Sequence, residues 1–339
     1  MAEGDLLVVE DLVVEFLSDE GPLRAVDGVS FSLRPGEIFG LCGESGSGKS
    51  TLALALARLL PPPAVITAGR VWLDGQDVFA LDAAGLRRLR GGQMAVVPQS
   101  GMNALHPLLT IADQIIDGIV AHAAPAPAGG DRSRRKGAAD RAAELLALVG
   151  LDPGVGRAFP HQLSGGMRQR AAIAIALGPA PSLLVMDEAT GGLDVLLERQ
   201  LCDRLQDLAQ RLGLAILFIS HDLPATLTLA ARAGVLYGGR LVEVGPAAAL
   251  RTDPEHPYTR ALLACFLDPR RSHGSHPAGI AGAPPDPRRL PSGCAFHPRC
   301  PLAFERCSRE RPLLLSRPEK PERAAPLVRQ NACHLGGDS

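Results

Sequence analysis

The chain has almost no net charge, no long apolar run and no closely spaced cysteine pair. Its 35 Lys and Arg residues nearly balance its 36 Asp and Glu residues, for a formal charge of −1. This balance excludes a general binder of nucleic acid or of an anionic membrane surface, because both need an excess of positive charge. No apolar segment reaches the roughly 20 residues that cross a bilayer, since Leu52–Leu60 ends at a run of prolines. Any membrane association is therefore expected to come through partner subunits.

The start of the chain also lacks a targeting signal. Met1–Asp5 is acidic and has no signal-peptide pattern, so we expect a cytoplasmic protein. Residues 121–137 are rich in Ala, Pro and Gly and end in the basic run Arg132–Lys136. We interpret that run as a solvated surface loop; a partner site there is the weaker alternative.

The most informative segment that is present is Gly-Glu-Ser-Gly-Ser-Gly-Lys-Ser-Thr at residues 43–51. It matches the pattern of a glycine, four residues and Gly-Lys-Ser, between an apolar run at 38–42 and a helix-like run at 52–60. Glycines let backbone N–H groups turn toward phosphate oxygens at a helix N-terminus, whose dipole favours anions. The segment predicts a nucleoside triphosphate site made of Gly43, Ser45, Gly46, Ser47, Gly48, Lys49, Ser50 and Thr51.

A second motif, Leu-Ser-Gly-Gly-Met-Arg-Gln-Arg at residues 163–170, opens another predicted helix. Ser164, Gly165 and Gly166 again place a hydroxyl and backbone donors at a helix N-terminus, which makes a second phosphate-binding device. One chain rarely needs two such devices for one nucleotide. They make sense if two copies pack head to tail, so that each nucleotide lies between the phosphate loop of one copy and Ser164–Gly166 of the other.

The two motifs together resemble the ATPase domain of ABC transporters. The resemblance implies ATP and Mg²⁺ as ligands and an α/β fold of the P-loop NTPase class, with a mixed sheet and a helical subdomain. It implies a nucleotide-binding domain at residues 5–250, with the helical subdomain at about 81–180, and a C-terminal extension at 251–339. The motifs occur once, which predicts a single nucleotide-binding unit.

The resemblance also assigns roles to residues that follow predicted strands. Asp187 and Glu188 end the apolar run that begins at Leu183. Asp187 would hold Mg²⁺ through water, and Glu188 would point at the attacking water. Two carboxylates at the end of a buried strand argue for a cation site over a solvated loop. His221 follows the next predicted strand and is placed like the family's switch histidine, which senses the γ-phosphate.

The remaining family positions are Gln99 and Asp194. Gln99 matches the glutamine that links Mg²⁺ to the surface contacting the membrane subunits, so that Ser50, Gln99 and Asp187 form the expected Mg²⁺ set. Asp194 lies in the loop that crosses the dimer interface. The chain departs from the family at Ala189, where proline is usual, and in having no adenine-stacking aromatic at residues 19–24.

The C-terminal part narrows the resemblance to a subfamily. Residues 253–263, with His-Pro-Tyr at 256–258, are similar to the tail of ATP-binding subunits of dipeptide/oligopeptide (and nickel) importers. The segment after Gln99, Met102–Ile111, resembles the same group. The resemblance implies a second ATPase subunit (the same chain or a paralogue), two transmembrane permease subunits and an extracytoplasmic peptide-binding protein. It places the chain at the cytoplasmic face of the membrane, and nothing in it implies a nucleic-acid partner.

The seven cysteines fall into two sets. Three sit singly in apolar or helical segments and are interpreted as small core residues. The other four gather in a short Pro-rich tail, where cytoplasmic cysteines bind metal more often than they form disulfides. Their spacing is too wide for a Cys-x-x-Cys zinc ribbon, and the subfamily resemblance favours a [4Fe–4S] cluster, with zinc as the alternative through His297 and His334. The four are Cys294, Cys300, Cys307 and Cys333.

Other functions remain as alternatives. An accessory ATPase of the carbon–phosphorus lyase type has a similar core but binds a soluble enzyme complex; the cysteine tail and the His-Pro-Tyr segment argue against it. A DNA-repair or chromosome-organising ATPase would interrupt residues 81–160 with long coiled coils, and no sustained heptads occur there. Import of nickel or another small solute is a further alternative, because the ATPase sequence does not name the cargo.

Overall fold

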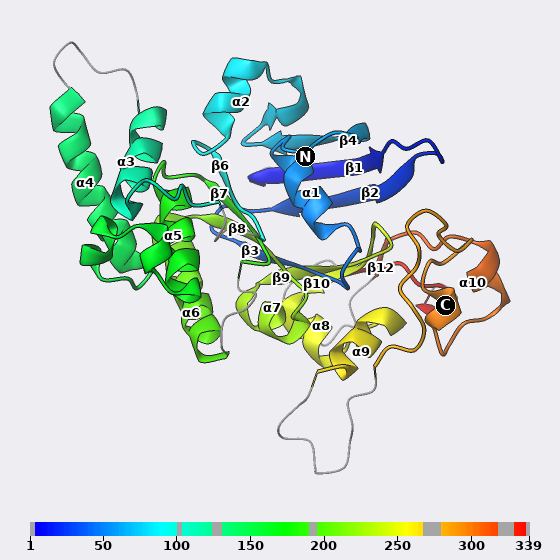
Figure 1. Cartoon of the computed structure of the whole chain (residues 1–339). Coiled ribbons are helices and arrows are strands. Elements are labelled where there is room, and N and C mark those ends of the chain that lie inside the picture. Colours follow the sequence, from blue (N-terminus) through cyan, green and yellow to red (C-terminus); the bar gives the residue numbers. More distant parts are fainter. Residues whose placement is uncertain are drawn as a thin grey trace. The chain divides into compact units, whose positions relative to one another are not determined.

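Figure 1 shows the computed structural model of the chain, which describes residues 4–99, 104–123, 131–189, 195–266, 279–317 and 329–336. The chain forms two compact units, and each unit combines segments that are far apart in the sequence. Unit 1 is drawn from Met1–Leu7, Leu33–Ile38 and Trp72–Ile219, and unit 2 from Val8–Ser32, Phe39–Val71 and Ser220–Ser339. The domain boundary expected near residue 250 stays a prediction.

Unit 1 contains three neighbouring parallel strands, β6 (Met94–Val97), β7 (Leu183–Asp187) and β8 (Ala215–Ser220). Val185 of β7 is in register with Val96 on one side and with Leu217 on the other. Every residue of β7 is buried, as expected for a parallel strand that is covered on both faces and therefore apolar throughout. The carboxyl ends of these strands present Gln99 and Glu188, which follow β6 and β7.

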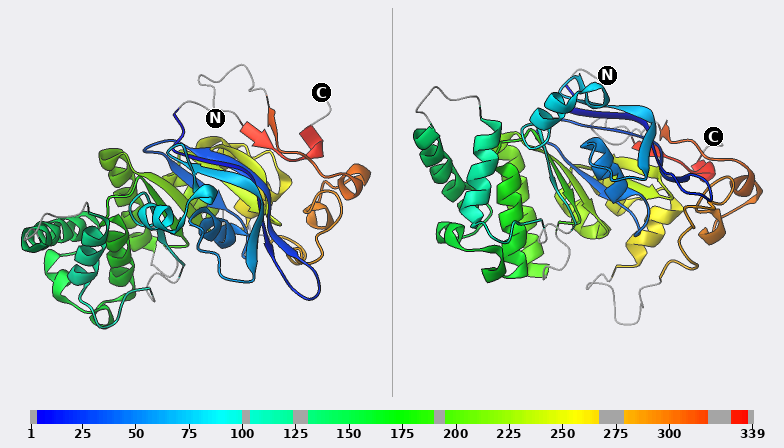
Figure 2. Two further views of the ribbon diagram at one scale, coloured as in Figure 1. Left: turned by 90° about the horizontal axis from the view of Figure 1, so that it is seen from above. Right: turned by 45° about the horizontal axis from the view of Figure 1, so that its top comes forward.

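The helices α3, α4 and α5 of unit 1 pack against one another (Figures 1 and 2). The structure corrects the loop expected at residues 132–136, because helix α4 already begins at Asp131. Arg and Lys are good helix formers, and the buried residues that follow, Ala138, Ala142, Leu145 and Leu146, repeat at helical spacing. Residues 132–136 therefore belong to the first turns of a helix, where Arg135 and Lys136 are exposed.

The other elements of unit 1 are short or connect these layers. Their bounds are β5 (Gln76–Asp77), η1 (Val78–Ala80), α2 (Ala83–Leu89), α3 (Ile111–His122), α4 (Asp131–Leu148), η3 (Pro153–Arg157), η4 (Pro160–Gln162), α5 (Gly165–Leu177) and α6 (Val195–Leu212). No helix within the described ranges combines the length and the apolar composition that a membrane span requires.

Unit 2 is built on the strand order β11-β12-β10-β9-β3, with β2, β1 and β4 in a second sheet. β3 and β9 are parallel, whereas β9 and β10 form a hairpin at Gly238 and Gly239, with Tyr237 opposite Arg240. The C-terminal strands extend this sheet, since Glu243 of β10 is opposite Asn331 of β12. Strands β11 and β12 of the C-terminal extension thus belong to the sheet whose strand β3 leads into the phosphate loop.

In unit 2, β3 has the expected bounds of 38–42, whereas the helix expected at 52–60 spans residues 49–56. The strands are β1 (Leu7–Phe16), β2 (Leu23–Leu33), β3 (Ile38–Cys42), β4 (Ala64–Leu73), β9 (Arg232–Tyr237), β10 (Arg240–Pro246), β11 (Leu315–Arg317) and β12 (Arg329–Asn331). The helices are α1 (Lys49–Leu56), α7 (Leu223–Leu229), α8 (Ala247–Thr252), α9 (Pro257–Ala264), η5 (His297–Arg299), α10 (Glu305–Arg309) and η6 (His334–Gly336).

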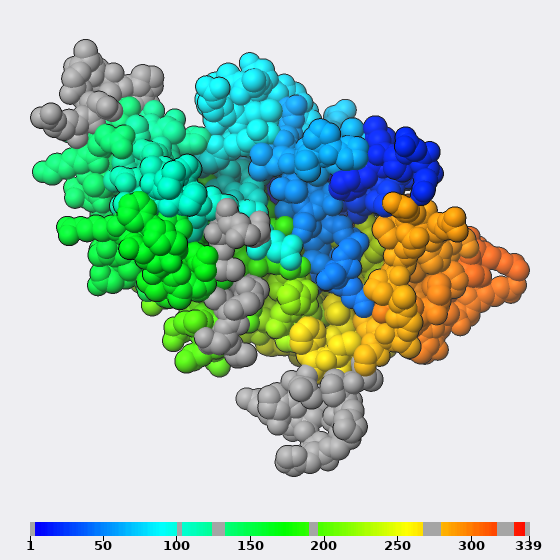
Figure 3. Space-filling view, in the orientation of Figure 1, coloured from blue at the N-terminus to red at the C-terminus, as the bar shows by residue number. Residues whose placement is uncertain are grey.

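An aromatic cluster anchors the extension to the sheet. Tyr237 ends β9, Tyr258 lies in α9 and Phe296 precedes η5, and all three are almost fully buried. The ring centroids are 4.5 Å apart for Tyr237 and Tyr258, and 5.3 Å apart for Phe296 and either tyrosine. Large buried aromatics at these distances stabilise a core through area and ring geometry together. In Figure 3 the extension, in orange, adjoins the dark blue N-terminal segment. Arg288 of the extension pairs with Glu20, which lies between β1 and β2, at 2.9 Å.

Candidate nucleotide-binding site

The phosphate loop of unit 2 has the backbone conformation that its glycines were expected to allow. Gly43, Gly46 and Gly48 have positive φ values of 155°, 78° and 103°. A Cβ on Gly43 would lie 2.2 Å from the Leu236 carbonyl oxygen, and a Cβ on Gly48 would lie 2.2 Å from the Ala25 carbonyl oxygen. Only glycine combines these angles with such close backbone neighbours. The loop is thus held tightly between strands β2 and β9.

Lys49 lies at the centre of this loop. Its residue is only 4% exposed, and its Nζ donates to the carbonyl oxygens of Gly43 at 2.8 Å and Glu44 at 2.9 Å. A third contact reaches Ser47 Oγ at 3.4 Å. A buried ammonium needs anionic or oxygen partners, and here the loop itself supplies them. A glycine cradle with a buried lysine at the start of helix α1 fits the phosphates of a nucleotide.

The other predicted residues of the loop occupy the expected places. Ser47 is buried, whereas Ser45 and Gly46 are exposed at the tip of the loop. Ser50 and Thr51 lie in the first turn of α1 and are partly buried. The Ser50 hydroxyl is therefore at the helix N-terminus, where a hydroxyl can reach a cation bound to phosphate.

Two predicted catalytic residues meet where strands β6 and β7 end, at a site that we call the carboxylate edge of unit 1. Gln99 Nε2 donates a hydrogen bond to Glu188 Oε2 at 2.6 Å, although the residues are 89 positions apart in the sequence. Asp187 is 5% exposed at the end of β7. Glu188 has a positive φ of 48°, a sparsely populated conformation for a residue other than glycine, and its N–H donates to the Ile219 carbonyl at 2.9 Å. The turn after β7 therefore directs the Glu188 side chain to Gln99.

The second phosphate-binding motif starts helix α5 as expected. Ser164 is the N-cap and its Oγ accepts from the Met167 N–H at 3.3 Å. Arg170, one turn into α5, stabilises the helix start: its side chain donates to the carbonyl oxygens of Gly166 at 3.3 Å and Gly150 at 2.9 Å. Ser164 is exposed and Gly165 is half-buried, so this helix start is open to a ligand or a second chain.

Two further predicted residues are His221 and Asp194. His221 belongs to unit 2 and is exposed just before the N-cap Asp222 of α7. Asp194, with the rest of its loop, lies outside the described residues. The roles of both stay predictions.

The four tail cysteines line one small pocket in unit 2, together with His297 and His334. Burial, and then the neighbouring thiols, raise the pKa of Cys294 to about 11, and burial also raises the pKa of Cys300. These groups are therefore protonated thiols at neutral pH when nothing is bound. Within the described ranges, no three His, Cys, Asp or Glu side chains are arranged to hold a metal ion. The convergence of the cysteines is shown, whereas metal binding is not.

Sequence analysis missed the residues by which the C-terminal extension contacts the phosphate loop. Arg299 of η5 forms a bidentate ion pair with Glu44, at 2.7 Å for Nη1–Oε2 and 3.0 Å for Nη2–Oε1. The Glu44 N–H donates to Tyr258 Oη at 2.9 Å. The hydrogen bonds to Glu44, ahead of an opposing effect of burial, raise the pKa of Arg299 above its ordinary value. No local sequence pattern indicates that these two residues pair across 255 positions.

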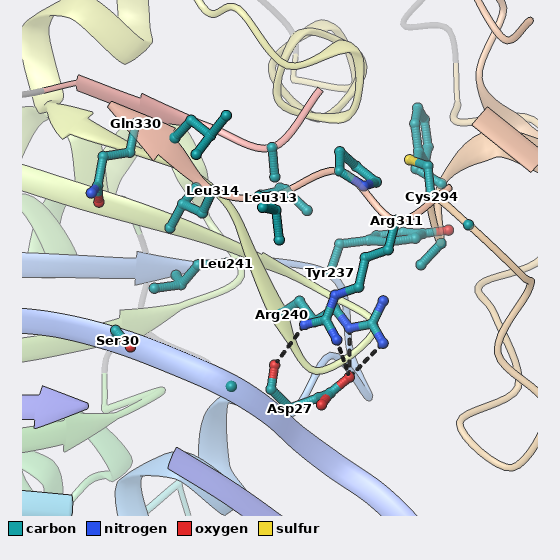
Figure 4. A pocket seen from close by; sticks show the side chains of 18 of the residues that line it. Asp27, Ser30, Tyr237, Arg240, Leu241, Cys294, Arg311, Leu313, Leu314 and Gln330 are labelled. Atoms are coloured by element: carbon teal, nitrogen blue, oxygen red, sulfur yellow. Dashed lines mark hydrogen bonds and ion pairs between the residues drawn. The ribbon is translucent and has the colours of Figure 1, made fainter. Parts of the chain in front are cut away.

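A larger cavity of about 540 Å³ lies beside the extension, between β2, β10 and residues 311–315 (Figure 4). Asp27 contacts three guanidinium groups there: Arg240 at 2.5 Å, Arg24 at 3.2 Å and Arg311 at 3.3 Å. Burial alone would raise the pKa of Asp27, but these cations outweigh it and lower the pKa below its ordinary value. The Asp27 N–H also donates to the Gly239 carbonyl, and the Gly239 N–H donates to the Ser47 carbonyl. Asp27 and its three arginines form a charged hub, and backbone hydrogen bonds connect this hub to the phosphate loop.

This combination of a glycine cradle, a buried lysine, a strand ending in two carboxylates and a serine-capped helix defines an ABC-type ATPase. Comparison with known proteins agrees. Residues 26–191 match the ABC transporter family, and residues 242–307 match the family described as oligopeptide/dipeptide transporter, C-terminal region.

Relatives match over nearly the whole chain. The dipeptide transport ATP-binding protein DppD of Escherichia coli is 39% identical over 91% of this chain and 92% of its own length. A putative peptide import ATP-binding protein of Brucella abortus is 39% identical over 97% of each chain. The oligopeptide transport ATP-binding protein OppD of Mycobacterium tuberculosis is 42% identical over 91% of this chain, which spans 50% of that protein.

A solved structure supports the same class. A dimeric ATP-binding cassette in a post-hydrolysis state with ADP and Pi superposes with a TM-score of 0.62 and 27% identity, over 71% of this chain and 98% of that one. The chain belongs to the ABC transporter ATPase family, in the branch that carries the oligopeptide/dipeptide transporter C-terminal region. The family predicted from the motifs is thereby confirmed, and with it an ATP-hydrolysing subunit.

Proposed function

We propose that this chain hydrolyses ATP to drive import of dipeptides or oligopeptides across the cytoplasmic membrane. One observation carries the proposal: the phosphate loop and a C-terminal region of the peptide-transporter type occur in one chain, and named peptide-transport ATP-binding proteins match both. The accessory-ATPase alternative shares the core only, so the match at 242–307 counts against it. Import of nickel or another small solute in place of peptides is the alternative that the transport test distinguishes.

The geometry of each unit supports the following ATP-binding roles. The loop amides and Lys49 would bind the phosphates, and Ser50, Gln99 and Asp187 would hold Mg²⁺. When bound, Mg²⁺ would neutralise charge on the phosphates, as in other phosphoryl-transfer sites. Supporting this assignment, Lys49 is already buried within an oxygen-lined loop.

Glu188 would polarise the water that attacks the terminal phosphate. The hydrogen bond from Gln99 at 2.6 Å orients the Glu188 carboxyl group, which supports a role in positioning water. His221 would sense the γ-phosphate, and its exposed position just after β8 is compatible with that role.

A second ATPase chain would complete the site. Ser164, Gly165 and Gly166 of that chain, with Asp194 of its interface loop, would contact the nucleotide bound to this chain's phosphate loop. The accessible N-terminus of α5 supports this arrangement. The second chain is this chain again or a paralogue.

The wider assembly would place the chain at the cytoplasmic face of the membrane. Two transmembrane permease subunits would hold it there, and an extracytoplasmic peptide-binding protein would deliver the cargo. The names of the relatives support this setting, since they are transport and import ATP-binding proteins.

The tail cysteines would hold a [4Fe–4S] cluster, with zinc as the alternative. Supporting this, Cys294, Cys300, Cys307 and Cys333 line one pocket, and thiolates are the usual ligands of such clusters. Binding would require these side chains to rearrange, because no three of them are placed for a metal ion in the described part of the chain. Their role would be structural. Anaerobic purification, a visible spectrum and analysis of iron, sulfide and zinc test this: iron and sulfide lost in Cys300→Ser support the cluster, one zinc supports the alternative, and no metal overturns both.

The transport proposal is tested by uptake of a radiolabelled dipeptide into cells whose own copy of the chain is deleted. Complementation with the wild-type chain is expected to restore uptake, and Glu188→Gln is expected to fail at equal expression. Unlabelled tripeptide and Ni²⁺ serve as competitors. Wild-type uptake in the deletion strain, or restored Ni²⁺ uptake without dipeptide uptake, would contradict the peptide assignment.

A further inference from the structure

The phosphate loop of this chain is fastened to the C-terminal extension at Glu44, the second residue of the loop. Three groups hold Glu44 from different directions. Arg299 binds its carboxylate, Tyr258 Oη accepts its N–H, and Lys49 binds its carbonyl oxygen at 2.9 Å. A loop residue fixed at side chain, N–H and carbonyl has little freedom to reorient.

Arg299 is itself held in place on every side. Its side chain is only 6% exposed. Nε donates to the Ala281 carbonyl at 3.0 Å, Nη1 contacts Tyr237 Oη at 3.3 Å, and the guanidinium carbon lies 5.9 Å from the centre of the Tyr237 ring. The planar fork of an arginine satisfies all these partners at once, whereas a lysine ammonium cannot.

We propose that Arg299 is a positioning residue for ATP, which holds the phosphate loop in its binding conformation through Glu44. Glycine-rich loops are mobile unless they are restrained, and a loop that is already in its bound conformation loses less entropy when phosphate binds. Arg299 therefore acts on ATP affinity and touches no reacting atom. This inference needs only the ATPase assignment and is independent of the cargo.

Arg299 also joins two sites that are separate in sequence. It is the residue before Cys300 and ends η5, whose first residue, His297, has its Nδ1 2.9 Å from the Cys294 carbonyl oxygen. The loop that carries two of the pocket cysteines is thus the loop that restrains the phosphate loop. A change in that cysteine pocket can therefore reach the phosphate loop through the Cys300–Arg299 peptide bond and the Arg299–Glu44 ion pair.

The test is a comparison of ATP affinity and turnover in the full-length chain. Binding is measured by fluorescence titration with a mant-labelled ATP and Mg²⁺, and turnover by steady-state phosphate release. Loss of a charge-assisted bidentate pair predicts that Arg299→Gln raises Kd and KM about 10-fold or more, with kcat at saturating ATP changed less than about 3-fold. Arg299→Lys is expected to recover only part of the affinity.

A double-mutant cycle isolates the contribution of the Arg299–Glu44 pair to ATP affinity. Glu44→Gln is expected to weaken ATP binding as Arg299→Gln does, and the double variant is expected to be no weaker than the worse single variant, within about 2-fold. Tyr258→Phe keeps the buried ring but removes the acceptor for the Glu44 N–H, so a smaller rise in Kd is expected. Arg309→Ala is the matched control: it removes an arginine of the same extension that pairs with Glu305 at the surface and is 72% exposed.

A purely structural role of Arg299 gives a different result. Partial unfolding lowers the active fraction, and therefore kcat, while KM and Kd of the folded molecules stay at the wild-type value. That outcome, or additive effects of Glu44→Gln and Arg299→Gln, overturns the proposal. If Arg299→Gln does not fold, the Arg299→Lys and Tyr258→Phe variants decide. A wild-type chain without ATP hydrolysis would instead contradict the ATPase assignment itself.

Discussion

The phosphate loop of unit 2 and the carboxylate edge of unit 1 are built in different ways. The loop is enclosed by backbone neighbours, a buried lysine and an ion pair from the extension. Glu188 and Gln99 meet in an exposed hydrogen bond on turns that follow two strands. The first arrangement suits a rigid cradle for phosphate, and the second suits side chains that change partner when water and substrate arrive. Variants of the loop should therefore change nucleotide affinity, and variants of the edge should change turnover.

The largest effect is expected from Glu188→Gln. The amide keeps the size of the side chain but cannot act as a base, so ATP hydrolysis should fall by about 100-fold or more. The Kd for Mg²⁺ and mant-ATP should stay near the wild-type value, because Glu188 is not part of the phosphate cradle. Hydrolysis at the wild-type rate would contradict the role of Glu188.

The next effect is expected from a methyl group placed in the phosphate loop. Gly48→Ala puts a Cβ about 2.2 Å from the Ala25 carbonyl oxygen at a φ of 103°, so both the contact and the backbone angle are unfavourable. Loss of ATP binding and a lower melting temperature are expected. Gly137→Ala is the control: Gly137 lies in helix α4 with nothing near its Cβ position, and alanine should stabilise the helix by up to ~1 kcal/mol. Equal melting temperatures for the two variants would argue against the enclosed loop.

Acid is expected to unfold unit 2 through His256. Burial, only partly opposed by a backbone hydrogen bond, lowers the pKa of His256 to about 3 from the ordinary value of 6.5. The contribution of neutral His256 to stability is complete above pH 6.5 and is lost as the pH falls toward 3. Between these values His256 binds a proton in the unfolded chain but stays neutral in the folded chain. The slope from this group is up to ~1.4 kcal/mol per pH unit. Urea unfolding at pH 7 and pH 5 should show a smaller loss in His256→Gln than in the wild-type chain; an equal loss would exclude His256 as the cause.

A smaller effect is expected at the hub of Figure 4. Asp27→Asn leaves Arg240, Arg311 and Arg24 without their shared carboxylate, and a loss of about 1–2 kcal/mol is expected. Because its pKa is lowered, Asp27 stabilises the fold at neutral pH and loses that effect only as the pH falls below its ordinary range. Asp207→Asn, which removes an exposed pair with Arg211 in helix α6, is the control and should change stability by less than about 0.5 kcal/mol. A neutral Asp27→Asn would mean that the three arginines do not need the carboxylate.

Local elements of both regions could be predicted from the sequence, whereas their long-range contacts could not. Strand β3, the loop and the strand before Asp187 follow from local pattern, since glycine spacing and apolar runs set them within a few residues. The Arg299–Glu44 pair joins positions 255 residues apart, and the Asp27–Arg240 pair joins positions 213 apart. No local pattern encodes such contacts. The start of α4 was missed for another reason: a basic run resembles a loop in composition, whereas its helix propensity and the apolar positions after it decide the outcome.

The most direct test is whether the phosphate loop governs ATP affinity while Gln99 and Glu188 govern turnover, and it compares two variants. Mant-ATP affinity and steady-state ATPase activity are measured for Arg299→Gln and Glu188→Gln in the full-length chain. The predicted result is a separation: Arg299→Gln loses affinity and keeps its turnover at saturating ATP, while Glu188→Gln keeps affinity and loses turnover. If both variants lose the same parameter, the two regions do not divide ATP binding and hydrolysis between them.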